Sequence, residues 1–391
     1  MPKTFVLAPD SFKESMTAEQ ACQAMQSGIQ KVLPDARFIE VPMADGGEGT
    51  VDALIAAQGG QKIECEVTGP LASQKIHTYF GLVDEGKTAI IEMAKANGIH
   101  LLEPVQRNPL LTTTLGTGEM IKTALDLGIS KIIIGLGGSI TNDAGAGMAQ
   151  ALDAKFLDVA GCDVVVGGGQ LDQIKKIDLS CLDARLAQTE IIIASDVNNP
   201  LCGANGASYV FGPQKGATPE MVKILDNNLN HFADMIEQQL GIDCRDIAGA
   251  GAAGGLGFGL MVFAGASIHS GVELVIEQTK LAEKIAQADY VLTGEGKIDD
   301  QTKFGKTPYG VAQVAKRLNK PVIAFAGMLG EGIEELYEEG FTQIIGINPT
   351  DCDLEDALKN AERHLETTAM NIALEIINNL DTAPFGVQKT E

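Results

Sequence analysis

The residues with the clearest chemical potential lie in a glycine-rich stretch, GLGGSITNDAGAGM, at positions 135–148. It follows a β-branched run at 131–134, typical of a buried strand, and leads into a segment at 148–152 that can form a helix. Glycines between a strand and a helix let backbone N–H groups approach an anion, and the helix N-terminus adds positive potential. The polar residues within the stretch are Ser139, Thr141, Asn142 and Asp143. The alternative interpretation is a tight turn in which Asp143 caps the helix.

Three further polar loops each follow a predicted strand. They contain Asp10, Ser11 and Lys13 after the strand at 4–8; Asp45, Gly46, Gly47 and Glu48 after the strand at 38–41; and Gly294, Glu295, Gly296 and Asp299 after the strand at 290–293. In a doubly wound sheet, ligands bind at the carboxyl ends of the strands, so these loops are expected to share one edge. For any one loop alone, a solvated polar turn is the alternative.

Phosphoryl transfer needs a lysine or backbone cradle for phosphates, Mg²⁺ on a carboxylate, and a base near the acceptor hydroxyl. Asp196 ends the strand predicted at 191–194 within a hydrogen-bonding cluster, where it could hold Mg²⁺, take a hydroxyl proton or simply cap a turn. The chain has candidates for every part: Lys13 and Lys215, the glycine loops, and Asp45, Asp143 and Asp196.

Two other motifs are discounted. GAGAAG at 249–254 matches the dinucleotide pattern G-x-G-x-x-G, but no convincing strand precedes it, so tight helix packing is the better interpretation. GKT at 305–307 resembles the end of a P-loop, but Asp300 occupies the position of the first glycine. Lys306 could still bind phosphate.

The composition excludes several classes of partner. The net charge is −23 without a basic run, which argues against nucleic acid and anionic membranes. The 7 cysteines are scattered without a C-x-x-C pair, as expected of a reducing compartment. No signal peptide and no apolar run of membrane length is recognisable. The sequence therefore predicts a cytoplasmic protein.

Two patterns of predicted secondary structure position these loops. The chain ends alternate strands with helices, and together they give five parallel-type strands and five helices, the count of a flavodoxin-like doubly wound sheet. The predicted strands are 4–8, 38–41, 290–293, 322–326 and 342–347. One helix is predicted from Thr17, a second is opened by the segment 42–50 and runs through Val51, Leu54 and Ile55, and three more span 307–318, 333–339 and 354–379.

Between the chain ends, strands at 62–68, 76–83 and 88–93 have no long helix between them and indicate a mixed sheet. A brief strand is expected at 209–211 and an amphipathic helix at 221–240. The prediction is an α/β protein whose flavodoxin-like domain, 1–70 and 289–391, is interrupted by a second α/β domain at 71–288. Residues 382–391 are expected to form a frayed tail.

Eight motifs together resemble the bacterial glycerate kinase type 1 family. They are APDSFKES (8–15), PMADGGEGT (42–50), RNPLLTTTLGTGE (107–119), GLGGSITNDAGAGM (135–148), DVNNPLCGANGAS (196–208), VFGPQKGA (210–217), GAAGGLG (251–257) and LTGEGKID (292–299). The resemblance extends to about Leu380. Glu14 and Ile140 replace the glycine and alanine commonest in the family.

The resemblance implies ATP-dependent, magnesium-dependent phosphorylation of the small molecule D-glycerate in glycerate, glyoxylate or sugar-acid catabolism. It favours 2-phosphoglycerate over 3-phosphoglycerate as product, and it leaves a homo-oligomer open. A nucleotide-dependent oxidoreductase and a non-catalytic sugar-acid sensor are the competing classes; the first would use residues 249–254.

Roles can be suggested for the motif residues. The predicted catalytic residues are Asp45, Asp196 and Lys13, with one aspartate as base and the other on Mg²⁺. The predicted substrate-binding residues are Asp10, Ser11, Gly46, Gly47, Glu48 and Arg107, with Lys13 and Arg107 facing the glycerate carboxylate. The predicted nucleotide-binding residues are Gly137, Gly138, Ser139, Thr141, Asn142, Asp143, Lys215, Gly294, Glu295 and Gly296, and the predicted metal ligands are Asp196 and Asp143.

Overall fold

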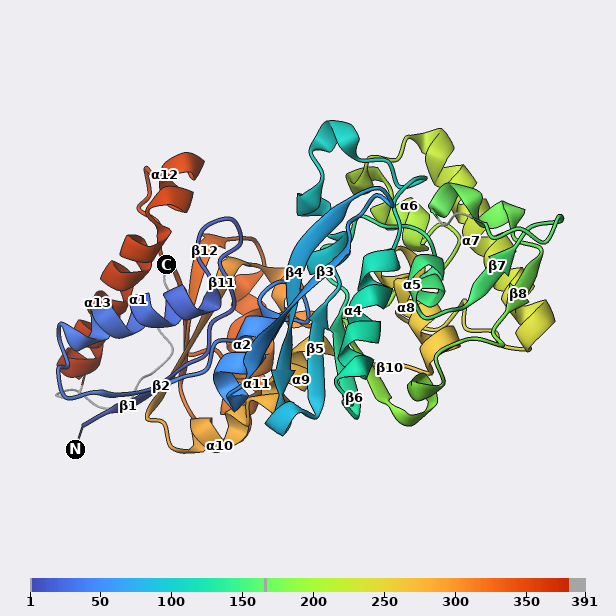
Figure 1. Ribbon diagram of the computed structural model, residues 1–391. Helices are drawn as coiled ribbons and strands as arrows, with labels where there is room; N and C mark the ends of the chain where they lie inside the picture. Colours follow the sequence, from blue (N-terminus) through green and yellow to red (C-terminus); the bar gives the residue numbers. More distant parts are fainter. Residues whose placement is uncertain (1, 165–166, 380–391) are drawn as a thin grey trace. The chain divides into compact units, whose positions relative to one another are not determined.

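The computed structural model describes residues 2–164 and 167–379 (Figure 1). The tail expected at 382–391 lies outside the described residues. Contacts divide the chain into two compact units. The first comprises Met1–Asp45, Asp52–Gln58 and Val272–Glu391, and the second comprises Gly46–Val51 and Gly59–Gly271.

The first unit is built on a 5-stranded parallel sheet with the order β13-β12-β11-β1-β2. Its strands are β1 (Thr4–Leu7), β2 (Arg37–Glu40), β11 (Tyr290–Ile298), β12 (Val322–Leu329) and β13 (Gln343–Gly346). Numbered within this unit, the order is 2-1-3-4-5, which is that of flavodoxin-like sheets. Phe5 pairs with Tyr290, so strands from the two chain ends are neighbours, as predicted.

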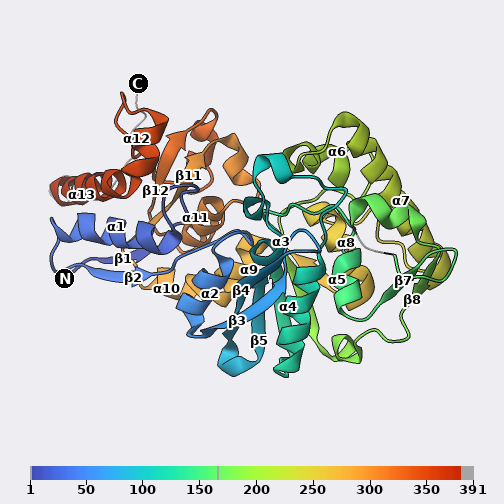
Figure 2. The same ribbon diagram turned by 45° about the horizontal axis from the view of Figure 1, so that its top comes forward.

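Helices cover both faces of this sheet. They are α1 (Ala18–Gln30), α2 (Thr50–Gln58), α9 (Gly271–Gln278), α10 (Leu281–Ala286), α11 (Thr307–Arg317), α12 (Leu354–Lys359) and α13 (Ala361–Asn379). Figures 1 and 2 show α1 and α13 side by side, and both share a core with Phe5 and Leu7 of β1. Val6 between them is equally buried, so the opposite face of the strand is covered too.

Local signals set the ends of these helices. Thr17 caps α1, because its hydroxyl accepts from the Gln20 N–H and the Gln20 side chain accepts from the Thr17 N–H. The helix predicted at 333–339 is instead a short 3₁₀ turn, Ile333–Tyr337. Glycines at 332 and 340, both with positive φ, confine this turn.

The second unit contains a 6-stranded mixed sheet with the order β10-β9-β6-β5-β4-β3, which confirms the predicted α/β class. Its strands are β3 (Gln61–Thr68), β4 (Lys75–Val83), β5 (Thr88–Glu92), β6 (Lys131–Gly135), β9 (Glu190–Ala194) and β10 (Ser267–His269). β3, β4 and β5 pair antiparallel, and β5, β6, β9 and β10 pair parallel. A separate antiparallel pair is formed by β7 (Lys155–Leu157) and β8 (Lys176–Asp178).

The helices of the second unit are α3 (Ala94–Asn97), α4 (Leu115–Asp126), α5 (Ala146–Ala151), α6 (Ala207–Phe211), α7 (Pro219–Leu240) and α8 (Ala252–Ala264). The strand predicted at 209–211 is wrong, because these residues end α6, whose first residues Ala207 and Ser208 are buried. The predicted packing role of 249–254 is confirmed: a side chain at Gly254 would meet the Thr141 carbonyl. In the described part of the chain no helix is both long and apolar enough to cross a membrane.

The units divide the chain at residues other than those predicted. Residues 59–70 belong to the second unit because β3 pairs with β4 along its length, with Val67 opposite Ile76. Residues 272–288 belong to the first unit, where the Gln58 side chain of α2 donates to that of Gln278 in α9 at 3.0 Å. Hairpin pairing of β3 with β4 and packing of α2 with α9 therefore set the boundaries.

Candidate active site

In the first unit, Asp10 is fixed at the carboxyl end of the sheet. After β1 the chain continues along β11, where the Asp10 N–H donates to the Gly294 carbonyl at 2.9 Å. The buried Asp10 carboxylate accepts from the Ser11 N–H at 2.6 Å and from the Thr307 hydroxyl at 2.5 Å. Thr307 is the first residue of α11, so this carboxylate ties the loop after β1 to a helix from the other chain end.

A second carboxylate, Asp45, acts on Asp10. The segment after β2 runs along the loop after β1, with the Met43 N–H donating to the Pro9 carbonyl at 2.9 Å. Burial and the negative charge of Asp45 raise the pKa of Asp10 to about 7, against the opposing effect of the Thr307 and Ser11 hydrogen bonds. An environment that holds a carboxyl between its charged and neutral forms at neutral pH is typical of functional sites.

Glu295 of β11 belongs to the same cluster. Its carboxylate accepts from the Thr302 hydroxyl at 3.2 Å and from the Lys306 ammonium at 3.4 Å. Burial raises the pKa of Glu295 to about 7, Lys306 opposes this shift, and Asp10 adds to it. The structure thus brings together two residues, Asp10 and Glu295, that the sequence assigned to different ligands.

Lys13 is the exposed cation of this loop. A Cβ atom at Gly296 would lie 3.4 Å from the Lys13 backbone nitrogen, so the Lys13 backbone lies next to β11. Glu14, at a position where the resemblance implies a glycine, has a φ of 65°. Glycine adopts this left-handed conformation more readily than other residues do.

In the second unit, the glycine stretch packs against the glycines that follow Asp45. A Cβ atom at Gly135 would lie 2.2 Å from the Gly46 carbonyl oxygen, and one at Gly137 would lie 2.7 Å from the Gly47 Cα. These approaches are open only to glycine. They place the predicted substrate glycines against the predicted nucleotide glycines. Glu48, next in the chain, is exposed.

The segment containing α3 forms backbone hydrogen bonds with the glycine loop. The Ile99 N–H donates to the Gly138 carbonyl at 2.8 Å, and the Ile140 N–H donates to the Asn97 carbonyl at 3.0 Å. The buried Asn97 side chain accepts from the N–H and the hydroxyl of Thr117 at 3.0 and 2.7 Å. Asn97 thereby links the loop to α4.

Asp143 fastens the end of the loop. Its carboxylate, fully buried, accepts hydrogen bonds from the N–H and hydroxyl of Thr114 and from the N–H groups of Gly145 and Gly147. Burial raises the pKa of Asp143, and these hydrogen bonds oppose the shift. Gly145 is the N-cap residue of α5, so Asp143 supports this helix start through backbone N–H groups.

Two more loop side chains meet partners from later in the chain. The Lys215 ammonium donates to the Ser139 hydroxyl at 2.8 Å and to the Thr141 carbonyl at 2.6 Å. The Asn142 amide oxygen accepts from the Ser208 hydroxyl at 3.2 Å, and its buried amide nitrogen has no hydrogen-bond partner among the described residues.

The other predicted residues divide between the units. Asp196, half-buried after β9, accepts from the Gly271 N–H at 3.2 Å. Arg107 donates to the Leu102 carbonyl at 3.2 Å and lies in the second unit. Lys13, its predicted partner on the glycerate carboxylate, lies in the first, as do Gly294, Glu295 and Gly296.

Three positioning residues were missed from the sequence: Thr307, Thr114 and Asn97. Thr307 lies in the discounted GKT motif, and Thr114 lies in the stretch 107–119 from which only Arg107 was selected. Both threonines therefore lie in motifs that the sequence itself singles out. Asn97 lies in none of the selected motifs, and only its tertiary contacts reveal it.

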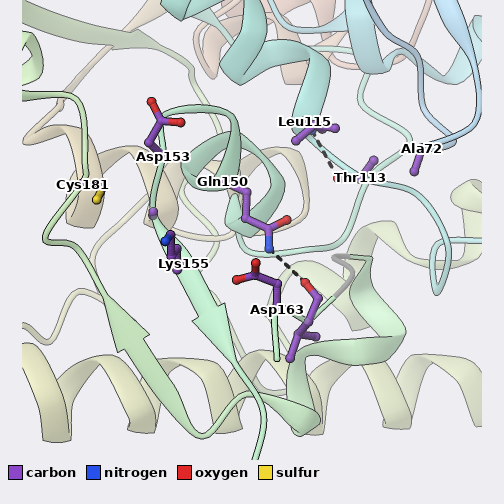
Figure 3. Close-up of a pocket in the computed structure, with 10 residues that line it drawn as sticks. Ala72, Thr113, Leu115, Gln150, Asp153, Lys155, Asp163 and Cys181 are labelled. Atoms are coloured by element: carbon purple, nitrogen blue, oxygen red, sulfur yellow. Dashed lines mark hydrogen bonds between the residues drawn. The ribbon is translucent and has the colours of Figure 1, made fainter. Parts of the chain in front are cut away.

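A cavity of ≈ 680 Å³ lies in the second unit, beside the starts of α4 and β7 (Figure 3). Its lining residues are Ala72, Thr113, Leu115, Gln150, Asp153, Ala154, Lys155, Asp163, Val164 and Cys181. Gln150 donates to the Val164 carbonyl at 2.9 Å across its wall. None of the residues predicted to carry chemistry lines this cavity.

The described geometry defines a two-unit α/β protein with a carboxylate cluster in one unit and a glycine loop in the other, each at the carboxyl ends of strands. The glycerate kinase family profile matches residues 5–377. The chain is 53% identical to a glycerate kinase of Haemophilus influenzae over 369 residues, covering 94% of this chain and 97% of that protein. It is 48% identical to the glycerate 2-kinase of Escherichia coli over 368 residues, covering 94% and 96%.

A crystal structure from Salmonella typhimurium LT2, assigned as glycerate kinase 2, superimposes with a TM-score of 0.86 at 47% identity. The match covers 97% of this chain and 100% of that one. The chain therefore belongs to the glycerate kinase family, the transferases that phosphorylate glycerate.

Proposed function

We propose that this enzyme transfers the γ-phosphoryl group of ATP to D-glycerate and releases 2-phosphoglycerate and ADP. The observation that carries the proposal is the match along almost the whole chain to curated glycerate kinases. The name of the Escherichia coli relative, glycerate 2-kinase, favours the 2-product. ATP as donor is supported by the glycine loop, whose backbone suits an anionic ligand.

The acceptor hydroxyl is proposed to attack the γ-phosphorus while the bond to the bridging oxygen of ADP breaks. Asp45 or Asp196 takes the hydroxyl proton. Asp10, Ser11, Glu48, Lys13 and Arg107 are proposed to bind glycerate, with the two cations on its carboxylate. The glycine loop and the N–H groups of Gly46 and Gly47 are proposed to bind phosphates, and Gly294, Glu295 and Gly296 are the nucleotide candidates of the first unit.

Mg²⁺ is proposed as the metal, where it would neutralise charge on the phosphate oxygens. Among the described residues, no group of three or more His, Cys, Asp or Glu side chains could hold a metal by itself. This fits Mg²⁺, which usually takes one or two carboxylates together with substrate phosphates. Asp196, half-buried, is the better ligand candidate, because both oxygens of Asp143 already accept hydrogen bonds.

One assay tests this proposal. ADP release is measured with D-glycerate, with L-glycerate and without acceptor, and NAD(P) reduction is followed in parallel. We expect ADP release that depends on D-glycerate, stops with EDTA and returns with Mg²⁺. Phosphorus NMR of the product distinguishes 2- from 3-phosphoglycerate. Hydride transfer without ADP release would overturn the proposal, and a 3-phosphoglycerate product would overturn its regiochemistry.

The cellular setting is also proposed. A cytoplasmic location is supported by the sequence and by the cysteines, all of which are free. Catabolism of glycerate, glyoxylate or sugar acids is the proposed source of the substrate. A homo-oligomer stays open, and light scattering of the purified protein would decide it.

A further inference from the structure

Lys215 is a buried lysine at the end of a 3₁₀ turn, Pro213–Lys215. Its side chain is 1% exposed. A buried ammonium group is costly unless it is well hydrogen-bonded, so such a residue needs a physical reason. Burial lowers the pKa of Lys215 to about 7, and the charge of Asp143 acts in the opposite direction.

The hydrogen bonds of Lys215 go to the glycine loop. Its ammonium donates to the Ser139 hydroxyl at 2.8 Å and to the Thr141 carbonyl at 2.6 Å, on the two sides of Ile140. The partners are therefore a hydroxyl and a backbone carbonyl, more than 70 residues away along the chain. Hydrogen bonds from a charged donor are stronger than neutral ones.

The base of Lys215 is itself fixed. Its N–H donates to the Gly212 carbonyl at 3.0 Å, and Pro213 restricts the turn. Gly216 follows with a φ of 91° and packs against the Arg107 backbone. The ammonium thus extends from a constrained turn, while Asn97 and Ile99 hold the loop by separate hydrogen bonds.

We propose that Lys215 is a positioning residue that fixes Ser139 and Thr141 in the nucleotide-binding form of the loop and does not touch the nucleotide. This inference rests on the proposed function of the loop, and it replaces the direct nucleotide contact expected from the sequence. Because Lys215 is 1% exposed, a phosphate bound at the surface of the loop would reach its ammonium only after the residues that cover it had moved. Removing the ammonium would leave the buried Thr141 carbonyl without the donor seen here.

The test is a double-mutant cycle with Lys215→Met, Ser139→Ala and the double variant. The measurements are kcat, the KM values for ATP and D-glycerate, and the thermal unfolding temperature. Lys223→Met, an exposed lysine on α7, is the matched control. We expect Lys215→Met to lower kcat/KM for ATP by about 10- to 100-fold. The KM for D-glycerate should change less than about twofold, and the double variant should lose little beyond Lys215→Met because coupled residues are not additive.

Three results would overturn the inference. Losses that multiply in the double variant would indicate that Lys215 binds the nucleotide independently. An unchanged kcat/KM for ATP in folded Lys215→Met would indicate a purely structural lysine, and equal rises in the KM values for ATP and D-glycerate would exclude action through the nucleotide loop. If Lys215→Met does not fold, Lys215→Gln, which keeps one donor group, carries the same test. Absence of glycerate-dependent ADP release in the parent would instead refute the proposed function.

Discussion

Replacing Asp10 by asparagine should make the protein more stable and less active. Asparagine keeps an oxygen for the Ser11 N–H, and its amide can donate to the Thr307 hydroxyl in place of the present bond. The substitution removes a buried negative charge from beside Asp45 and Glu295. It also removes a carboxylate proposed to bind glycerate.

The magnitude follows from the pKa of Asp10, which is raised from 3.8 to about 7. Because the folded protein holds this proton more tightly than the unfolded chain, the stabilisation is complete below about pH 4 and is lost as the pH rises through 7. Three pKa units correspond to about 4 kcal/mol, an upper bound for the gain at pH 8. Between pH 5 and 7, Asp10 contributes a slope of about −1.4 kcal/mol per pH unit to the free energy of unfolding of the parent, and Asp10→Asn should remove this contribution.

The assay is urea unfolding at pH 5, 6, 7 and 8 for the parent and Asp10→Asn, with Asp35→Asn, an exposed carboxylate of the same unit, as control. The free energies of unfolding should diverge as the pH rises, and kcat/KM for D-glycerate should fall by about tenfold or more. A variant that is less stable than the parent at pH 8, or that keeps the parent's slope, would refute the reasoning. Unchanged glycerate kinetics would remove Asp10 from the proposed substrate site.

Four other substitutions test the rest of the site. Gly138→Val should weaken ATP binding by about tenfold without unfolding the protein. The reason is that Gly138 has a φ of 72° and lies beside Ala94. Unchanged ATP binding in calorimetry would count against nucleotide binding by this loop. Asp143→Ala should lower the free energy of unfolding by about 4 kcal/mol or more, since four buried donors lose their acceptor. A decrease of less than about 1 kcal/mol, measured by denaturant unfolding, would contradict this. Asp45→Asn and Asp196→Asn should each fold and lower kcat by ~10²–10⁴; turnover within a few-fold of the parent in both would place the base elsewhere.

The sequence by itself determined the class of fold and most of the chemical residues. Strands such as Ile132 to Ile134 are recognisable because buried parallel strands are continuous β-branched runs, a local property. The polar loops are recognisable because they follow those strands directly. Adding the two chain ends then gave five strands, and their observed order is that of a flavodoxin-like sheet.

The tertiary structure decided which of those residues meet and what they do. Asp10 and Thr307 form a hydrogen bond across 297 residues, a contact that no local pattern encodes. The sequence suggested Lys215 as a phosphate ligand, and the structure shows that it is buried and donates to Ser139; its burial depends on packing between distant segments. The unit boundaries depend on strand pairing: the side-chain pattern of β3 indicates a strand, and its pairing with β4 shows which sheet it joins.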